Sequence, residues 1–410
     1  MNTPELIITL ATPVFFALIA LELLVAKLRG RKAYHGSDAI NSIGLGVISQ
    51  IVGVFAKVLS LGIYAWCVEH LALFTLSPGS LWVWASGLLL YDFLYYWLHR
   101  CGHEVNILWA AHVVHHQSED YNLSTALRQT SSGALLGWLF YLPMALLGYP
   151  LQVFVVVALI DLLYQFWVHT EMVGRLGWFD RVFCSPSNHR AHHAVNDRYL
   201  DRNYGGILIL WDRLFGSFVE EDDNDPPLYG TRSPLRSWNP LWANAEVYWA
   251  TLQDCWHARR WRDKLLVWLK PPGWRPADVA ERYPKPAFDL RRKRFEPPIS
   301  RALIGYCLVQ FALLLAMATQ FLQMAGSAGM PTLLAYAGYL VFSLCVLGAL
   351  MEGRRQAFWL EGVRVLATAI VPLASGRWFG LEHLAMPLAV ALLLVFALSA
   401  TALPWLRRLG

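Results

Sequence analysis

The chain has 410 residues, of which 56% are hydrophobic and only 15% are charged. Soluble globular proteins carry about 25% charged residues, so this composition, with apolar runs near the length of a bilayer span, predicts an integral membrane protein. The net charge is +5, but no basic patch interleaves with aromatic residues, which argues against a nucleic-acid partner. The six cysteines include no Cys-x-x-Cys pair, so a disulfide framework is not expected.

Nine apolar runs are predicted to lie in the membrane. In chain order they are 5–26, 40–67, 81–99, 132–149, 151–169, 301–325, 331–350, 363–377 and 383–406. The first run follows the acidic Glu5 and ends in basic residues, which is the reverse of a cleavable signal peptide, so we expect it to be retained. The runs 132–149 and 151–169 meet at Tyr149-Pro150 and are also compatible with a hairpin that does not fully cross. The run 363–377 is short.

Lys and Arg alternate with these predicted spans. They are concentrated in the segments 27–32, 99–128, 170–300, 353–355 and 407–408, and they are sparse in the remaining connections. The positive-inside rule therefore places the basic segments on the cytoplasmic side. We expect a multi-pass protein of a bacterial cytoplasmic membrane, or of the endoplasmic reticulum membrane if the source is a eukaryote.

The chain divides into three predicted parts. Residues 1–235 form a membrane core, with the spans 5–26, 40–67, 81–99 and 132–169. Residues 236–299 are a cytosolic or interfacial segment, in which five tryptophans lie among Arg and Lys between 241 and 270. That pattern is typical of an amphipathic helix at a lipid surface, although a soluble helix packed on the core fits equally well. Residues 300–410 hold further transmembrane helices, with no titratable cluster apparent in the sequence.

Nine of the 13 histidines lie between His99 and His193. Their spacing is H-x3-H, then H-x2-HH, then a single histidine, then H-x2-HH again. On a helix such spacings place the imidazoles on one face, and neutral imidazole binds divalent transition metals well. Nine ligands are too many for one ion and about right for two. The candidate ligands are His99, His103, His112, His115, His116, His169, His189, His192 and His193.

The predicted fold is therefore all-α: a polytopic helical bundle with a cytosolic, histidine-rich cap that holds two metal ions. A histidine outside such blocks is more often a hydrogen-bonded structural residue, and we interpret His35, His70, His257 and His383 as non-ligands. No cysteine accompanies the histidines in a closed zinc module. Nitrogen-rich ligation favours two Fe ions, and zinc is expected to be able to replace them in purified protein.

Four polar residues near the histidines are candidates for supporting roles in catalysis. Asp92 and Asp161 lie inside predicted spans, where carboxylates often serve function; each could orient a ligand on a neighbouring helix or form a structural hydrogen bond. Glu104 follows His103 and could contact a cofactor, or be a solvated surface residue. Asn188 precedes His189 and could reach a metal through water, or cap a helix.

The histidine blocks resemble the fatty acid hydroxylase/sterol desaturase superfamily of membrane di-iron oxygenases. They read HRCGH at 99–103, HVVHH at 112–116 and HRAHH at 189–193, and the stretches 95–129, 165–171 and 188–218 are very similar to an ether-cleaving member. The resemblance implies that all nine histidines bind iron and that Glu104 contacts a pterin. Some members have a further histidine at the position of Val173, which implies one protein ligand fewer here.

This resemblance implies an O2-dependent monooxygenase acting on a lipid C–H bond. Hydroxylation of an ether lipid beside its ether oxygen would give a hemiacetal, which collapses to an aldehyde and an alcohol. The expected partners are the bilayer, the lipid and an electron donor, which is reduced pterin (tetrahydrobiopterin) or another reductant. The alternatives are a sterol desaturase or another lipid hydroxylase, and, outside enzymes, a metal transporter or a haem electron carrier. A transporter would place its ligands near mid-membrane, whereas these histidines lie at the ends of predicted spans.

Overall fold

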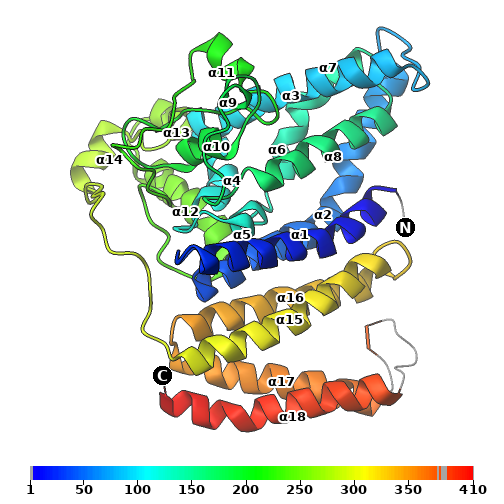
Figure 1. The fold of residues 1–410 in the computed structure, drawn as a ribbon, viewed down its shortest axis with the longest axis vertical. Coiled ribbons are helices and arrows are strands. Elements are labelled where there is room, and N and C mark those ends of the chain that lie inside the picture. Colours follow the sequence, from blue (N-terminus) through cyan, green and yellow to red (C-terminus); the bar gives the residue numbers. More distant parts are fainter. Residues whose placement is uncertain (1–2, 376–377, 380–385, 410) are drawn as a thin grey trace.

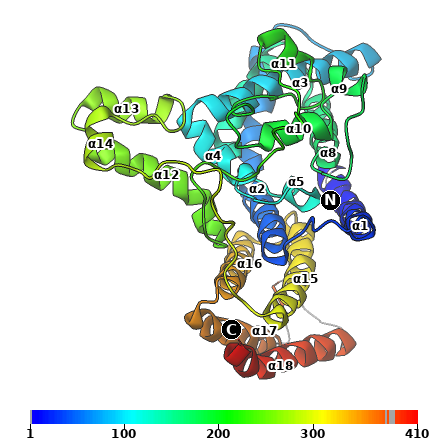
Figure 2. The same ribbon diagram turned by 60° about the vertical axis from the view of Figure 1, so that its left-hand side comes forward.

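The structure is a computed structural model that describes residues 3–375, 378–379 and 386–409 (Figure 1). Within these residues it is all-helical, as predicted. The described residues contain no strand, and isolated β-bridges join Phe183 with Leu208 and Asp222 with Asp225. The chain forms a membrane core, a cap at one end of that core, a projecting arm and a C-terminal bundle (Figures 1 and 2).

The membrane core is built from long apolar helices, because a helix satisfies its own backbone hydrogen bonds in lipid. These helices are α1 (Thr3–Leu28), α2 (Gly36–Leu71), α3 (Leu81–Glu104) and α8 (Leu151–Trp167). Helix α3 packs on α8, and α2 packs on the C-terminal bundle. Among the described residues, three helices are long and apolar enough to cross a membrane: Gly36–Ala56 of α2, and two helices of the C-terminal bundle.

The predicted span 132–149 is wrong as a single helix. The structure divides it into α6 (Gly133–Leu136), the 3-10 helix η1 (Gly137–Tyr141) and α7 (Leu142–Leu146). Gly133, Gly137 and Pro143 each weaken a continuous helix. The segment then turns at Gly148, whose φ of +84° and close approach to the carbonyl of Phe74 leave no room for a side chain.

The cap consists of short helices joined by irregular segments at one end of α3 and α8. They are α4 (Asn106–His116), α5 (Leu123–Ala126), α9 (Phe179–Val182), α10 (Pro186–His193) and α11 (Leu210–Phe215). Helix α10 starts where the Ser185 hydroxyl accepts a hydrogen bond from the Asn188 backbone N–H, with Pro186 in the first turn. Because these connecting segments are irregular, their backbone can lie close to the candidate ligand histidines.

The arm contains α12 (Pro240–His257), α13 (Trp261–Leu269) and α14 (Ala277–Arg282). Figure 2 shows these helices extending away from the rest of the molecule, beside the cap. Helix α12 packs on α4, and the end of α12 that leads to α13 extends away from the core (Figure 2). The arm corresponds to the segment 236–299 that was predicted to be amphipathic.

The C-terminal bundle consists of α15 (Arg301–Met324), α16 (Met330–Met351), α17 (Arg355–Ser375) and α18 (Met386–Leu409). Helices α15 and α16 match the predicted spans 301–325 and 331–350 closely, and they are the other two helices able to cross a membrane. Helix α17 begins at Arg355, before the predicted start at 363. Residues 376–377 and 383–385 of the last two predicted spans lie outside the described residues.

A buried polar network joins α15 and α17 of this bundle, where the sequence indicated no titratable cluster. The Arg364 guanidinium donates to Glu361 at 2.6 Å and to the Gln310 amide oxygen at 2.6 Å, and the Tyr306 hydroxyl donates to Glu361 at 2.6 Å. Glu361 is fully buried and Arg364 is 2% exposed. These residues are about 50 positions apart in the sequence, so only the packing of α15 against α17 reveals the network.

We expect Glu361→Leu to destabilise the protein by about 3–5 kcal/mol, because it leaves the Arg364 charge buried without its counter-ion. The measurement is thermal unfolding of the detergent-solubilised protein. The double variant Glu361→Leu/Arg364→Leu is the control, and it should recover most of the stability because apolar pairs of similar volume replace buried ion pairs at little cost. Equal unfolding temperatures for the single variant and the wild type would contradict this interpretation of the network.

Candidate metal centre

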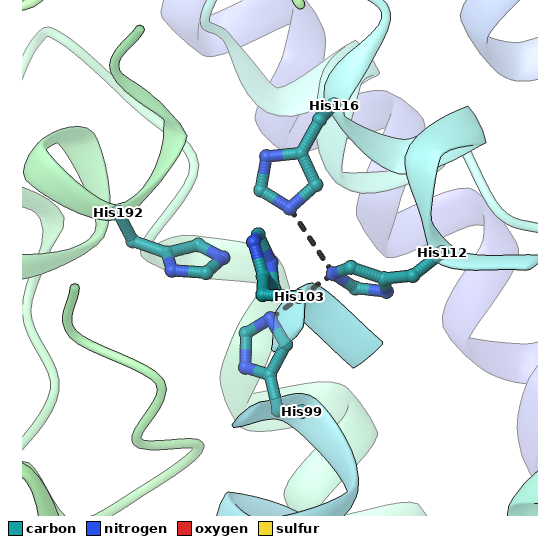
Figure 3. A group of neighbouring side chains, drawn as sticks. All are labelled: His99, His103, His112, His116 and His192. Atoms are coloured by element: carbon teal, nitrogen blue, oxygen red, sulfur yellow. Dashed lines mark hydrogen bonds between the residues drawn. The ribbon is translucent and has the colours of Figure 1, made fainter. Parts of the chain in front are cut away.

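The nine predicted histidines converge into two adjacent groups. In each group the candidate ligand nitrogens all lie within 4.8 Å of one another. Eight of the nine residues are buried, and His112 is half-buried. The first group is His99, His103, His112, His116 and His192, and the second is His115, His169, His189 and His193. Figure 3 shows the rings of the first group turned towards one another.

Each H-x2-HH block is shared between the two groups. In α4, His112 and His116 belong to the first group, and His115 belongs to the second. In α10 the assignment is reversed: His189 and His193 belong to the second group, and His192 belongs to the first. Residues i and i+4 are one helical turn apart and share a target, whereas i+3 is rotated towards the other side. The block spacing therefore builds two neighbouring sites from two short helices.

The remaining ligands come from the ends of the membrane helices. His99 and His103 lie one turn apart at the end of α3, and His169 follows the end of α8. The second group has four histidines, in agreement with the replacement of a further histidine by Val173. The Val173 backbone carbonyl instead accepts a hydrogen bond from Arg190 at 2.7 Å.

Backbone carbonyls orient four of the rings through Nδ1. The Nδ1 atoms of His99 and His192 lie 2.8 Å from the carbonyl oxygens of Tyr204 and Arg202. Those of His115 and His169 lie 2.8 and 2.7 Å from the carbonyl oxygens of Arg128 and Gln165. A carbonyl can only accept a hydrogen bond, so each of these Nδ1 atoms carries the proton. The Nε2 atom of each neutral ring therefore presents a lone pair to its group.

The contact between His115 and His169 shows why these lone pairs need a cation. Their Nε2 atoms are 3.1 Å apart, and in both rings the proton is on Nδ1. Two acceptor nitrogens at this distance cannot form a hydrogen bond with each other, and they repel unless a positive ion lies between them. The same spacing of 3.1 Å separates the Nε2 atoms of His99 and His112, and of His169 and His189.

A proton is a poor candidate for that positive charge. Burial lowers the pKa of His115 to about 4, so this ring is neutral at pH 7. Five other histidines of the two groups also have pKa values well below the usual range, mainly because they are buried and secondly because neighbouring rings repel the charged form. These residues are His112, His116, His169, His189 and His193. Neutral imidazole is the form that binds a metal.

The spacing of the nitrogens fits two metal ions. With metal–nitrogen bonds of about 2.1 Å, a separation of 3.1 Å corresponds to ligands about 95° apart, whereas tetrahedral ligands would be about 3.4 Å apart. Five histidines also exceed the four ligands of a structural zinc site. In addition, the Nε2 atoms of His103 and His192 are buried with no hydrogen-bond partner. Both atoms belong to the five-histidine group.

One short segment supports three ligands of the first group, and sequence reasoning missed it. Residues 201–204, which we name the support segment, provide the carbonyls behind His192 and His99, and the Asp201 carboxylate lies 3.6 Å from His103 Nδ1. Asp201 and Asn203 both have a φ of +56°, a left-handed conformation that Asp and Asn tolerate better than most residues. The sequence Asp-Arg-Asn was the available signal for such a turn.

Buried side chains hold the support segment in place. The Asn203 amide donates to the carbonyls of Asn188 and Val219 at 3.0 and 2.8 Å. The Asp212 carboxylate accepts from the backbone N–H groups of Tyr204 and Gly205 at 2.8 and 2.7 Å. The carbonyls therefore face the rings because the loop has little freedom to turn elsewhere.

The side chains of all four supporting candidates hydrogen-bond or pair with residues other than the histidines of the two groups. Asp92 accepts hydrogen bonds from the backbone of Ile207, at 2.7 Å, and from the Trp211 indole, at 2.8 Å, which corresponds to the structural alternative given for it above; a role in catalysis stays a prediction. Asp92 thereby fastens the loop before α11 to α3. Backbone carbonyls do the orienting that was expected from carboxylates.

The side chains of Asp161 and Asn188 form hydrogen bonds with other residues and not with the histidine rings themselves. Asp161 accepts a hydrogen bond from the Gln165 side chain, and the Gln165 carbonyl orients His169. The Asn188 amide donates to the carbonyls of Asp180 and Phe183, so it anchors α10 to α9 and does not point at the metal groups. Glu104 is 44% exposed at its side chain and pairs with Arg100 at 2.9 Å, outside both histidine groups.

The predicted non-ligands lie apart from the two groups, where they are described. His35 pairs with Asp120 at 2.9 Å and with Glu296 at 3.1 Å. His70 bonds to the Trp66 carbonyl, and His257 stacks on Tyr283. His383 lies outside the described residues.

An apolar cavity of about 410 Å³ opens beside both histidine groups. Its wall includes His99 and His112 of the first group and His115 and His169 of the second. The rest of the wall comes mainly from apolar side chains of α1, α2, α3, α8 and α15. A cavity of this volume and character suits a hydrophobic ligand, and it brings such a ligand to both candidate metal sites.

Comparison with known proteins agrees with this geometry. The Fatty acid hydroxylase family matches residues 84–217, which include every histidine of the two groups. Human alkylglycerol monooxygenase is 37% identical over 361 residues, covering 87% of this chain and 80% of the human protein. The zebrafish (Danio rerio) alkylglycerol monooxygenase is also 37% identical over 361 residues, covering 86% of this chain and 79% of its own.

A bacterial relative matches a shorter part of the chain. The ornithine lipid hydroxylase OlsE of Rhizobium tropici is 32% identical over 133 residues, 32% of this chain and 40% of its own. No solved structure matches the chain significantly. From the extent of these similarities, the chain belongs to the same family as the alkylglycerol monooxygenases and carries the fatty acid hydroxylase region over residues 84–217.

Proposed function

We propose that the protein is a non-haem di-iron monooxygenase that hydroxylates an ether lipid at the alkyl carbon next to the ether oxygen. The observation that supports this most strongly is the arrangement of nine imidazoles in two adjacent groups that line one apolar cavity. One oxygen atom of O2 enters the C–H bond, and the other leaves as water with two electrons and two protons from a donor. The hemiacetal product then collapses to a fatty aldehyde and a glycerol hydroxyl.

The histidines divide the metal-binding work. The five-histidine group holds one iron and the four-histidine group holds the other, with zinc as a substitute in purified protein. Two irons, when bound, supply the redox chemistry that activates O2 for attack on an unactivated C–H bond. The carbonyls behind His99, His115, His169 and His192 keep these rings in the tautomer that faces the metal.

The cavity positions the substrate and keeps bulk water away from the reacting carbon. Phe15 and Phe166 stack with ring centroids 4.3 Å apart, and both lie on the cavity wall. Tyr95, Gln165 and Asp161 form a hydrogen-bonded series on the same wall, close to His99 and His169. We propose that Asp161 and Asn188 contribute by fixing these positions, and that Asp92 does so more remotely through the loop before α11.

We propose that the electron donor approaches from the exposed side of the cap. Glu104 and Arg100 form an ion pair there, beside His103, and Asp201 is 48% exposed at its side chain. A reduced pterin such as tetrahydrobiopterin has ring N–H groups that can donate hydrogen bonds to a carboxylate such as that of Glu104. Another reductant of similar chemistry would use the same approach.

The protein is a membrane protein by its apolar helices and its relatives, and we propose that the cap faces the cytoplasm, as the basic segments indicate. We further propose that the arm rests on the lipid surface. Trp256 and Trp261 are 78% and 80% exposed at its tip, and Leu265 is 68% exposed. Arg259, Arg260 and Arg262 surround these residues, a combination suited to an anionic lipid interface.

The proposed activity predicts release of a fatty aldehyde from an alkylglycerol in the presence of O2 and reduced pterin. Anaerobically purified, iron-loaded protein is incubated with ether lipids and sterols, and the products are identified by mass spectrometry. A hydroxylated lipid without ether cleavage, or a new double bond in a sterol, would instead identify a hydroxylase or desaturase on this scaffold. An intense Soret band, or no product with any lipid, would contradict the proposed function.

Metal content provides a second test. We expect about two irons per chain in wild-type protein, because the nine histidines form two groups. His193→Ala removes a ligand from the four-histidine group alone and should lower the iron content by about one per chain, with loss of turnover. His35→Ala is the matched control, since His35 is a partly buried histidine that pairs with Asp120 outside both groups. Unchanged iron content in His193→Ala would exclude this ligand assignment.

The arm proposal predicts contact between its tryptophans and lipid. In bilayers made with brominated lipids, which quench indole fluorescence on contact, the wild type should lose more emission than Trp256→Phe/Trp261→Phe. Bilayers of the unbrominated lipids give the reference intensity for each protein. If the double variant is quenched to the same fractional extent as the wild type, the arm tip lies away from the membrane.

A further inference from the structure

The C-terminal bundle contributes to the wall of the lipid cavity. Leu315, Ala318, Thr319 and Leu322 of α15 line the same cavity as His99 and His115. The family match ends at residue 217, so these side chains lie outside the region that carries the metal ligands. Figures 1 and 2 show α15 below α1 and α5, whereas α4 and α10 lie above them.

The four residues form one face of α15 over about two turns. Their positions are i, i+3, i+4 and i+7, the spacing of a single helical stripe, and seven residues of helix extend about 10 Å. The only polar member is Thr319, and its hydroxyl already donates to the Leu315 carbonyl at 2.9 Å. This face therefore offers no free polar group to a ligand, and it suits a hydrocarbon.

The opposite end of the cavity has a different character. Besides four histidines, its lining includes Tyr95, Asp161 and Gln165, which are hydrogen-bonded to one another. A lipid that presents its oxygen-bearing end to the histidines would extend its alkyl chain away from this polar region. The face of α15 is the apolar wall that such a chain would approach.

Close packing fixes α15 relative to the core. A side chain at Gly36 of α2 would lie 2.9 Å from Ile304, and one at Gly44 would lie 3.7 Å from Phe311, so α2 approaches α15 closely through its glycines. The neighbouring α16 is anchored as well, because Glu352 at its end accepts hydrogen bonds from Ser237 and from the Trp238 backbone, at 2.7 and 2.6 Å. The wall has little freedom to retreat from a longer chain.

We propose that this face of α15 is the far wall of the lipid cavity and sets the length of alkyl chain that the protein accepts. The inference rests on the proposed function, since it assumes that the cavity binds the alkyl chain of the lipid substrate. It assigns a specificity-determining role to Ala318 and Leu322. It also gives the C-terminal bundle a function beyond crossing the membrane.

The test compares Ala318→Phe and Leu322→Ala with wild type on a homologous series of saturated alkylglycerols. Each methylene buried in an apolar site strengthens binding by about fourfold, so kcat/KM should rise with chain length until the cavity is full. Ala318→Phe should move the optimum to shorter chains and reduce kcat/KM for the longest chains by at least about tenfold. Leu322→Ala should move the optimum to longer chains, and it keeps the test decisive if the larger side chain prevents folding.

The matched control is Ala316→Phe, the same substitution on an exposed position of α15 outside the cavity. Its chain-length profile should match that of the wild type. The same series is measured as thermal stabilisation of the iron-loaded proteins without O2 or reductant, which reports binding without turnover. A length optimum that shifts in binding while no lipid is turned over would overturn the proposed function and support this inference. Unchanged profiles in both Ala318→Phe and Leu322→Ala would overturn the inference.

Discussion

The structure depends on the close approach of buried, neutral imidazole nitrogens. Rings whose Nδ1 protons are held by backbone carbonyls present bare Nε2 lone pairs to one another at 3.1 Å, as in His115 and His169. Burial removes the option of protonating them, so only bound cations make the arrangement favourable. Much of the cap serves this constraint. The left-handed residues Asp201 and Asn203 and the Asp212 carboxylate all hold backbone that faces a histidine ring of the first group.

The position of the metal groups follows from how the ligands are distributed between membrane helices and cap. His99 and His103 end α3, and His169 follows α8, so helices that line the apolar cavity also carry candidate metal ligands. The cap supplies the other ligands from two short helices, each of which serves both groups. A hydrophobic substrate can therefore remain in an apolar environment while it lies beside a polar, metal-binding centre. The expense of burying nine polar rings is offset by metal coordination and not by hydrogen bonding alone.

The sequence predicted what depends on local spacing. The histidine blocks identified all nine members of the two groups, because i, i+3 and i+4 on a helix already specify a shared face. The long apolar helices α15 and α16 were also predicted closely. Features that depend on tertiary contact were not predicted. These include the division of each block between two groups and the role of the support segment. They also include the hydrogen bonds by which Asp92 holds the loop before α11, and the Glu361–Arg364 network. The break within 132–149 is an intermediate case, because Gly133, Gly137 and Pro143 signalled it but the apolar composition outweighed them.

The two ends of the cavity are constrained differently. Hydrogen bonds fix the histidine end, whereas the packing of apolar side chains shapes the end formed by α15 of the C-terminal bundle. At the histidine end, four rings have a backbone carbonyl behind them and His103 has the Asp201 carboxylate nearby, so a substitution in the support segment would disturb several rings at once. At the α15 end, the wall consists of apolar side chains whose contribution is volume, and volume can change by a methylene without disturbing any ligand. Under the proposed function, this arrangement would let the substrate range change through a helix that carries none of the described histidines of the two groups. The glycines of α2 that admit α15, and the bonds from Glu352 to residues 237–238, fix the bundle against the rest of the chain. The bundle is thus part of the cavity wall by packing, although its sequence contains none of the histidine pattern.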